Sequence, residues 1–236
     1  MKILVIPDIH LKTKILDKAR EIMHTVSDID NIVCLGDIFD DFGQQDNSEL
    51  YKKTFDAVID FDLEFPNTLW CYGNHDISYV WKLFQSGYSY IAEADVKQYI
   101  QEFQNQFKDR YKYVHKIDDV VFSHGGISYD FVASVVKYAK DMNNPDIVVD
   151  RINSLSKREL WETLSPLWFR PQDNKNKIYY PRKLLQVVGH TPVKKVYRSN
   201  GILSCDVFST YRDGTPYGEQ KFVLLDTQTK EWSTLI

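Results

Sequence analysis

The sequence predicts an α/β fold in which two packed, mixed sheets are flanked by α-helices. Short apolar runs alternate with stretches of helical spacing in the first half, and short alternating segments separated by turn residues fill the last part. The composition is that of a globular protein, since 43% of the 236 residues are hydrophobic and 26% are charged. This balance excludes a disordered chain, a collagen-like chain and a coiled-coil rod. We expect a single domain over residues 1–236.

The first half of the chain alternates predicted strands and helices. Residues 2–6 form a continuous apolar run, as in a buried parallel strand, and apolar residues then recur at helical spacing from Ile15 to Val26. A second apolar run at 32–35 is followed by a helical pattern from Leu50 to Ile59, and a third run occupies 69–72. This order predicts parallel strands joined by right-handed crossovers.

The second half predicts one further clear helix and mostly antiparallel strands. The helix covers Val96 to Phe107, and residues 111–117 and 120–123 are predicted to pair as a hairpin. Residues 128–185 are mixed in character and are expected to form an insertion, with helices near 129–141 and 156–163. The remaining strands are expected at 185–188, 193–198, 202–208, 221–226 and 230–235.

Polar clusters follow five of the predicted strands. In open α/β sheets ligands bind outside the carboxyl ends of the strands, so we expect these clusters to converge. Carboxylate, imidazole and amide oxygen together suit borderline divalent transition metals and do not suit calcium. The two remaining histidines, His24 and His115, are expected to be ordinary surface or core residues. The clusters are Asp8-x-His10, Gly36-Asp37, Gly73-Asn74-His75-Asp76, Ser123-His124-Gly125-Gly126 and Gly189-His190-Thr191.

This set resembles the calcineurin-like metallophosphoesterase superfamily, whose blocks are D-x-H, G-D, G-N-H-[DE], an isolated H and G-H. All five blocks occur here in order between residues 8 and 190. The resemblance implies a ββ sandwich flanked by helices and a hydrolase that uses two divalent ions, drawn from Mn²⁺, Fe²⁺ or Fe³⁺, Zn²⁺ and Ni²⁺. It implies that Asp8 and His10 bind the first ion, that Asp37 bridges both, and that Asn74, His124 and His190 bind the second.

The resemblance also implies a mechanism. Two ions roughly 3.5 to 4 Å apart share a hydroxide that attacks phosphorus in line. His75 would protonate the leaving oxygen, and Asp40, three residues after Asp37, would fix its tautomer. Asp76 is expected to brace the loop.

Two further segments resemble the bacterial and phage-type branch of the serine/threonine protein phosphatases. They are His124-Gly125-Gly126-Ile127-Ser128 and Leu167-Trp168-Phe169-Arg170. This likeness implies that Arg170 binds the phosphate oxygens as a planar fork. The segment after Gly189 reads His190-Thr191-Pro192, without the second histidine that many diesterases carry.

The chain departs from that branch at one position. Protein phosphatases usually read G-D-x-x-D-R-G after the second strand, whereas Asp41 stands here in place of the phosphate-binding arginine. A carboxylate there repels a phosphate dianion unless it is turned away or paired. Arg182 or Lys183 is a candidate for compensating.

We therefore expect a phosphomonoesterase that acts on a phosphoprotein or on a phosphorylated small molecule. A dinucleoside polyphosphate or another nucleotide is the alternative substrate, because the G-H-T-P-V segment also occurs in symmetrical dinucleoside tetraphosphatases. Tyr79 and Trp81 are expected to line a substrate groove that suits a nucleobase or an aromatic side chain. A catalytically silent binding module of the same fold is a third alternative, although none of the ligand positions is lost.

Charge, hydropathy and cysteines set the expected surroundings. The net charge of −4 gives no overall attraction to nucleic acid or anionic membrane, and no apolar run reaches the roughly 18 to 20 residues of a membrane helix. Cys34, Cys71 and Cys205 are too sparse for a disulfide framework. We expect a cytoplasmic protein.

Overall fold

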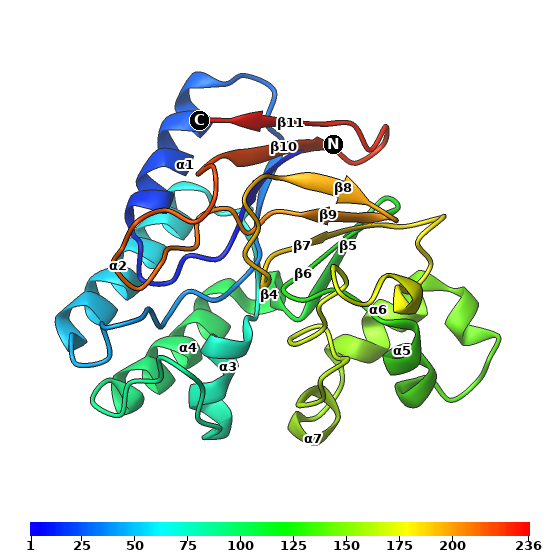
Figure 1. Ribbon diagram of the computed structural model, residues 1–236, viewed down its shortest axis with the longest axis horizontal. Coiled ribbons are helices and arrows are strands. Elements are labelled where there is room, and N and C mark those ends of the chain that lie inside the picture. The colour runs from blue at the N-terminus through cyan, green and yellow to red at the C-terminus, as the bar shows by residue number, and fades with distance from the viewer.

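Two mixed β-sheets form the centre of the protein (Figure 1). The computed structural model describes residues 1–236, apart from the side chain of Asn176. One continuous hydrophobic core takes residues from both sheets, including Val5 and Phe122. The first sheet has the order β11 (Trp232–Leu235), β10 (Phe222–Asp226), β1 (Lys2–Ile6), β2 (Asn31–Cys34), β3 (Leu69–Cys71) and β4 (Tyr111–Lys112). The second has the order β5 (Val114–Ile117), β6 (Val120–Ser123), β7 (Leu185–Val188), β9 (Ile202–Ser204) and β8 (Tyr197–Ser199).

Helices flank the two sheets on opposite sides, as Figure 1 shows. The long helices α1, α2 and α4 lie beside the first sheet, and α5, α6 and α7 lie on the side of the second. The α-helices are α1 (Lys14–Thr25), α2 (Ser48–Glu64), α3 (Asn74–Trp81), α4 (Glu93–Phe107), α5 (Tyr129–Val135), α6 (Pro145–Asn153) and α7 (Lys157–Leu160). Short 3-10 turns occupy Lys108–Arg110, Asp141–Asn143 and Lys175–Lys177.

The predicted parallel core is confirmed. β1 pairs in parallel with β2, with Ile3 opposite Asn31, and β2 pairs in parallel with β3. The hairpin is also confirmed, because β5 and β6 are antiparallel and turn at Asp118-Asp119. Apolar side chains drive this order, since every residue of β1 after Lys2 is buried.

The predicted strand over 111–117 is in fact two strands in different sheets. β4 pairs with β3 in the first sheet, and β5 pairs with β6 in the second. The chain crosses between the sheets at Tyr113, where the backbone N–H groups of Tyr113 and Val114 both donate to Asn153 Oδ1 at 3.1 Å. That acceptor comes from α6, far along the chain, so the division into two strands cannot be predicted from the local sequence pattern.

Several helices also differ from their predicted bounds. The segment after Gly73 is helical from Asn74 onward, whereas the sequence suggested a loop. The helix expected over 129–141 ends at Val135, and α6 was not predicted. Asn144 caps α6 and Pro145 occupies its first turn, which is a start signal that the mixed composition of this segment obscures.

The C-terminal strands are shorter than predicted and are divided between the sheets. β8 and β9 are antiparallel to each other, as are β10 and β11. However, β9 also pairs in parallel with β7, so the second sheet is mixed at this point. Residues 193–196, predicted as strand, precede β8 as an irregular segment.

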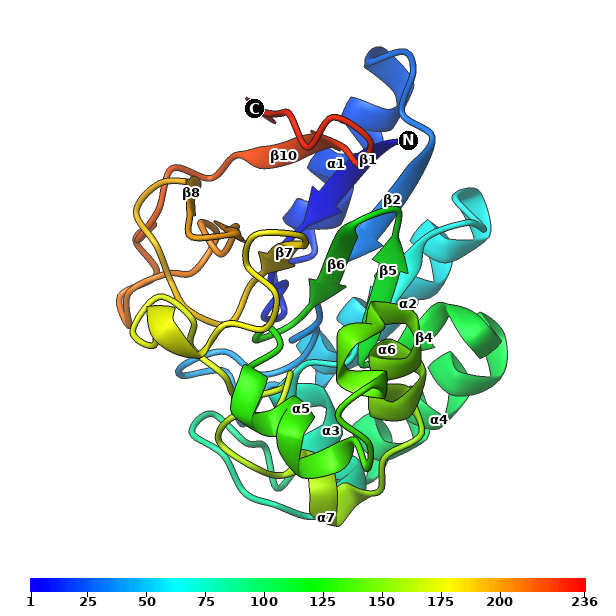
Figure 2. The same cartoon turned by 90° about the vertical axis from the view of Figure 1, so that its right-hand side faces the viewer.

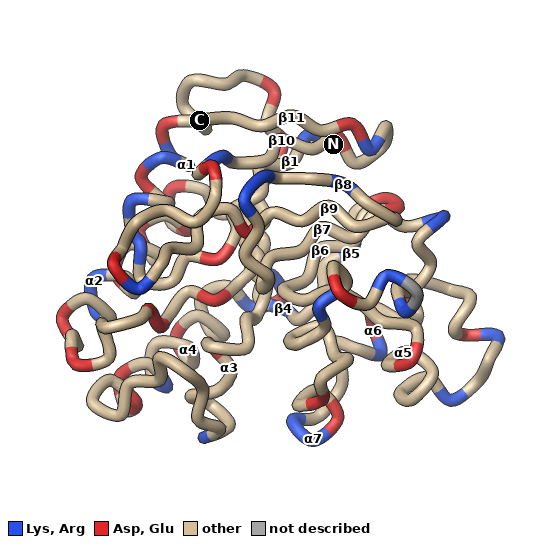
Figure 3. Tube along the Cα trace, in the orientation of Figure 1, with Lys and Arg blue, Asp and Glu red and all other residues tan. Residues whose placement is uncertain are grey.

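Charged residues of both signs are distributed over helices and loops (Figure 3). Within residues 1–236, no helix is long and apolar enough to cross a membrane.

Candidate metal centre and active site

The polar clusters converge because their strands end at one edge of the molecule. In Figure 2 the arrowheads of β1, β2, β6 and β7 point toward the same end. Asp8 and Asp37 follow strands of the first sheet, and His124 and His190 follow strands of the second. The site therefore lies where the carboxyl ends of the two sheets meet.

The backbone at this edge is strained in a consistent way. Five residues other than glycine have φ between 45° and 69°, in the left-handed region that costs side-chain-bearing residues about 1–3 kcal/mol each. Hydrogen bonds hold the strained turns together; for example, the N–H of His10 donates to the carbonyl of Asp37 at 2.8 Å. Such strain persists only where the surroundings over-determine it, and it clusters at functional sites. The five residues are His10, Leu11, Asp37, Asp40 and His190.

Two glycines allow the carboxylates to approach. A Cβ atom on Gly73 would lie 2.0 Å from Asp37 Oδ1, and one on Gly189 would lie 1.9 Å from Asp8 Oδ1. No larger residue fits at either position. The glycines of the G-N-H and G-H motifs are therefore required by the neighbouring aspartates.

Asp76 braces the loops that carry the site. Its Oδ1 accepts from the backbone N–H groups of Ile38 and Phe39 at 2.8 and 3.2 Å, and its Oδ2 accepts from Gly73 N at 3.0 Å. This buried carboxylate ties the loop after β2 to the start of α3. Burial and the nearby Asp37 raise the pKa of Asp76 to about 7.

The first group of potential metal ligands contains Asp8, His10 and Asp37, whose donor atoms lie within 4.8 Å of one another. His10 Nε2 is 4.0 Å from Asp8 Oδ2 and 3.8 Å from Asp37 Oδ2. His10 Nδ1 lies 2.7 Å from the carbonyl of Asp40 and must donate, because a carbonyl only accepts. The neutral ring therefore presents the lone pair of Nε2 to the two carboxylates, as a metal-binding histidine does.

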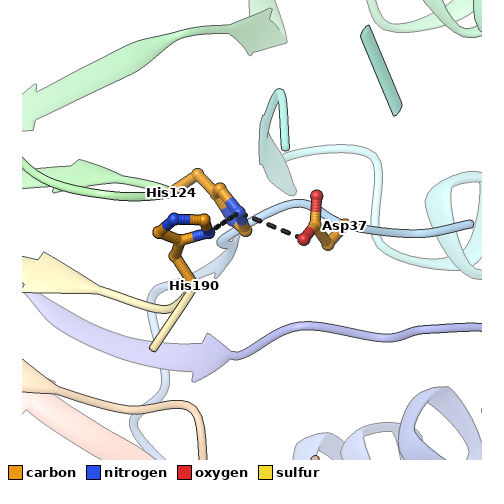
Figure 4. Close-up of side chains that lie close together, drawn as sticks. All are labelled: Asp37, His124 and His190. Atoms are coloured by element: carbon orange, nitrogen blue, oxygen red, sulfur yellow. Dashed lines mark hydrogen bonds and ion pairs between the residues drawn. The ribbon is translucent and has the colours of Figure 1, made fainter. Parts of the chain in front are cut away.

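The second group contains Asp37, His124 and His190 (Figure 4), and Asn74 lies against His124. His124 Nε2 lies 3.1 Å from Asp37 Oδ2, 2.9 Å from Asn74 Oδ1 and 3.1 Å from His190 Nδ1. His124 Nδ1 donates to the carbonyl of Leu35 at 3.0 Å, so Nε2 of the neutral ring carries a lone pair. Several electron-rich atoms thus point at one another, an arrangement that a shared cation stabilises.

The electrostatics of the buried site also favour bound cations. Burial lowers the pKa of His124, but the carboxylates of Asp37 and Asp8 outweigh it and raise that pKa to about 9. Burial likewise acts to raise the pKa of Asp37, yet His124 and His75 hold it far below its usual value. His190 Nε2 is buried and has no hydrogen-bond partner among the described residues. The residues present therefore fit two divalent cations, with Asp37 belonging to both groups.

His75 and Asp40 form a pair beside these groups. His75 Nδ1 lies 3.0 Å from Asp40 Oδ2, and the backbone N–H of His75 donates to Asp37 Oδ1 at 2.9 Å. The other oxygen of Asp40 accepts from the hydroxyls of Tyr51, at 2.9 Å, and Tyr79. Burial lowers the pKa of His75, but Asp37 and Asp40 overcome this and raise it to about 9.

A cleft of about 230 Å³ opens over the site. Arg170 lies at its wall and donates from one guanidinium nitrogen to the carbonyl of His190 and to Thr191 Oγ1, both at 3.1 Å. Trp168 packs edge-on against the His190 ring, with centroids 5.7 Å apart. The cleft is lined by His10, Lys12, Asp37, Asp40, Asp41, Phe42, Asn74, His75, Gln85, Ser86, Gly87, Trp168, Arg170, His190, Pro192, Asp206, Ser209 and Thr210.

A family model described as calcineurin-like phosphoesterase matches residues 1–214, nearly the whole chain. The chain belongs to the calcineurin-like phosphoesterase family. This family is dinuclear and metal-dependent, and its members hydrolyse phosphate esters, so the protein is a metal-dependent phosphoesterase. No curated protein sequence matches the chain.

Solved structures share the fold. A cold-active protein-tyrosine phosphatase of a psychrophile, Shewanella sp., aligns with a TM-score of 0.56 and 18% identity over 100% of this chain and 80% of that chain. Another structure of a cold-active protein tyrosine phosphatase aligns with a TM-score of 0.60 and 18% identity over 99% of this chain and 78% of that chain. A metallophosphoesterase from Sphaerobacter thermophilus aligns with a TM-score of 0.50 and 14% identity over 99% of this chain and 86% of that chain. At these identities the likeness establishes the fold alone.

Some residues of this phosphoesterase lie elsewhere than expected. Tyr79 does not line a groove, because it is fully buried and holds Asp40. Trp81 lies outside the cleft and packs against Trp161, with ring centroids 5.6 Å apart. Arg182 and Lys183 line a separate hollow and therefore do not compensate for Asp41.

The sequence also left functional neighbours undetected. Lys12 pairs with Asp41 at 3.0 Å within the cleft. Asp206 is buried after β9 and accepts a hydrogen bond from Ser209. Asp206 lies two residues after the end of β9, just as Asp8 lies two residues after the end of β1, but the strand predicted over 202–208 concealed this strand-end position. Tyr51 carries no comparable signal, because its contact with Asp40 depends on how α2 packs.

Replacing Asp37 tests the metal centre. We expect the wild type to bind two manganese ions per chain and Asp37→Asn to lose most of this binding, because a neutral amide bridges two cations poorly. Elemental analysis after manganese loading and desalting measures the stoichiometry. Asp41→Asn, on the same loop but paired with Lys12, is the matched control and should retain both ions. A wild type that holds only traces of transition metal would contradict the assignment.

Proposed function

We propose that this phosphoesterase is a phosphomonoesterase of the kind represented by serine/threonine protein phosphatases. The observation that carries the proposal is the placement of the His75–Asp40 pair and Arg170 around two ligand groups that share Asp37. The pair supplies a proton donor, Arg170 supplies a fixed positive charge, and the shared carboxylate supports a dinuclear centre. Together these groups match the needs of phosphate-ester hydrolysis.

The ligand assignment follows the two groups. Asp8 and His10 would hold the first ion, Asp37 would contribute to both ions, and Asn74, His124 and His190 would hold the second. Carboxylate, imidazole and amide donors favour manganese, iron, zinc or nickel. When bound, such a pair of ions supplies the Lewis acidity and the activated water that hydrolysis of a phosphate ester needs.

His75 acts as the general acid. Asp40 accepts from Nδ1 and so orients the ring, which leaves the Nε2 proton available for the leaving oxygen of the ester. Tyr51 and Tyr79 hold the other oxygen of Asp40, so the carboxylate is fixed before substrate arrives. His75 is 17% exposed, enough to meet a substrate in the cleft.

Arg170 binds the phosphate group. Its contacts with the His190 carbonyl and Thr191 fix one guanidinium nitrogen, and its planar fork leaves further donors for phosphate oxygens. A phosphomonoester dianion presents one more negative oxygen than a diester does, so a fixed cation favours the monoester. The segment between β6 and β7, which carries Arg170 and Trp168, thus serves as the substrate-side insertion.

A nucleotide remains the second candidate substrate. Phe42 and Trp168 both line the cleft, and the side chain of Phe42 is 49% exposed. An exposed aromatic face beside a phosphate site suits a nucleobase as well as a phosphorylated aromatic side chain.

The three cysteines are buried and unpaired, in keeping with the predicted cytoplasmic location.

Replacing His75 tests the general acid. His75→Asn should keep both ions but slow the hydrolysis of an alkyl phosphate by roughly 10²- to 10⁴-fold, and the loss should shrink for para-nitrophenyl phosphate, whose leaving group needs less protonation. Asp40→Asn should give a smaller loss in the same direction. Steady-state rates across a leaving-group series make the measurement, with the surface variant His24→Asn as control. Full activity of His75→Asn on the alkyl ester would remove His75 from the mechanism.

The substrate class is tested with a pair of chromogenic esters. The wild type should cleave para-nitrophenyl phosphate faster than its bis-para-nitrophenyl counterpart. Arg170→Ala should reduce the monoester rate by at least about 10-fold more than the diester rate, because only the dianion loses a charge-assisted fork. Arg158→Ala, an exposed arginine on α7, is the control. A wild type that strongly prefers the diester would rule out the phosphomonoesterase proposal and favour nucleotide diesters.

A further inference from the structure

Asp41 lines the cleft, and the proposed chemistry does not use its carboxylate. The other acidic groups that line the cleft are occupied: Asp37 lies among the ligand groups, Asp40 holds His75, and Asp206 accepts from Ser209. The side chain of Asp41 is 21% exposed in the same cleft. A free carboxylate at this position would repel a dianion.

Lys12 lies directly against Asp41. Its ammonium nitrogen is 3.0 Å from Asp41 Oδ2 and 3.4 Å from the carbonyl of His10. An ammonium group has three donors, so these two contacts leave one N–H free. The Lys12 side chain is also 21% exposed and also lines the cleft, so the remaining donor is accessible to a ligand there.

The backbone that places Lys12 is the strained turn of the first ligand group. His10 and Leu11 both have positive φ, at 45° and 60°, and the N–H of Leu11 donates to the carbonyl of Ile38 at 3.0 Å. Leu11 is buried, which anchors the turn in the core. The turn therefore fixes the backbone position of Lys12 next to His10, in the first ligand group. Arg170 lies next to His190, in the second ligand group.

We propose that Lys12 is a second phosphate-binding cation of this site and that Asp41 is its positioning residue. Resting on the proposed phosphomonoesterase function, this assignment places one fixed cation beside each ligand group, with the substrate phosphate between them. The cation comes from the loop after β1, and the carboxylate at position 41 serves to hold it.

A purely neutralising Lys12 is the competing explanation, and a double-mutant comparison separates the two roles. If Lys12 only cancels the charge of Asp41, Lys12→Gln weakens phosphate binding in the wild type but has no effect once Asp41 is Asn. If Lys12 contacts phosphate, the loss persists in the Asp41→Asn background, because a direct contact is removed in both cases.

The experiment measures the affinity of manganese-loaded protein for inorganic phosphate by calorimetry, in wild type, Lys12→Gln, Asp41→Asn and the double variant. We expect Lys12→Gln to weaken binding about 10-fold or more, as for the loss of a charge-assisted hydrogen bond, and to weaken it at least about 5-fold in the Asp41→Asn background. Lys12→Arg should stay within about 3-fold of the wild type. Lys14→Gln, an exposed lysine two residues further along, should bind phosphate as the wild type does.

Manganese content and melting temperature accompany each variant. Two results overturn the proposal while leaving the phosphomonoesterase function intact. One is an unchanged affinity in Lys12→Gln, and the other is a Lys12 effect that vanishes in the Asp41→Asn background when Asp41→Asn by itself binds phosphate as well as the wild type does. Loss of manganese in Lys12→Gln also overturns it, because Lys12 would then support the His10 turn instead. A manganese-loaded wild type that binds no phosphate and prefers the diester overturns both proposals together.

Discussion

Burying the Asp37 carboxylate at the end of β2 is the constraint on which this edge of the protein depends. An isolated buried carboxylate costs several kcal/mol, and only partners on several sides offset that cost. His124 and His10 lie 3.1 and 3.8 Å from Oδ2, and the N–H of His75 donates to Oδ1. Gly73 lacks a side chain where this oxygen sits, and the backbone of Asp37 takes a positive φ of 47°. The need to bury this single charge thus explains the strained backbone of Asp37, the glycine at position 73 and the three histidines that surround the carboxylate.

Residues around this charge also connect the two sheets. Asp8, from the first sheet, accepts from the backbone N–H of His190 at the end of the second, and His124, from the second sheet, donates to the carbonyl of Leu35 in the first. Residues that would hold the ions therefore also join the sheets. Ions that bind only the folded arrangement stabilise it, so metal binding and the packing of the two sheets are thermodynamically linked.

Patterns that depend on neighbouring residues were predictable from the sequence, and features that depend on distant contacts were not. The apolar runs of β1, β2 and β3 and the polar residues after them predicted the parallel core and the convergence of these polar residues at one edge. The break at Tyr113 was hidden, since it depends on Asn153 from α6. The family resemblance implied a phosphate-binding role for Arg170, but its contact with the His190 carbonyl was not predicted, because it depends on how two distant loops meet. The pairing of Lys12 with Asp41 depends on two strained turns from different loops, which composition and spacing do not reveal.

The central claim is that Asp37 lies between two metal ions held by ligands from both sheets. Anomalous X-ray diffraction from crystals of the manganese-loaded protein, recorded on both sides of the manganese absorption edge, tests it most directly. The account predicts two anomalous peaks that flank the Asp37 carboxylate, one beside Asp8 and His10 and the other beside Asn74, His124 and His190. A single peak, or peaks that Asp37 does not contact, would contradict the account.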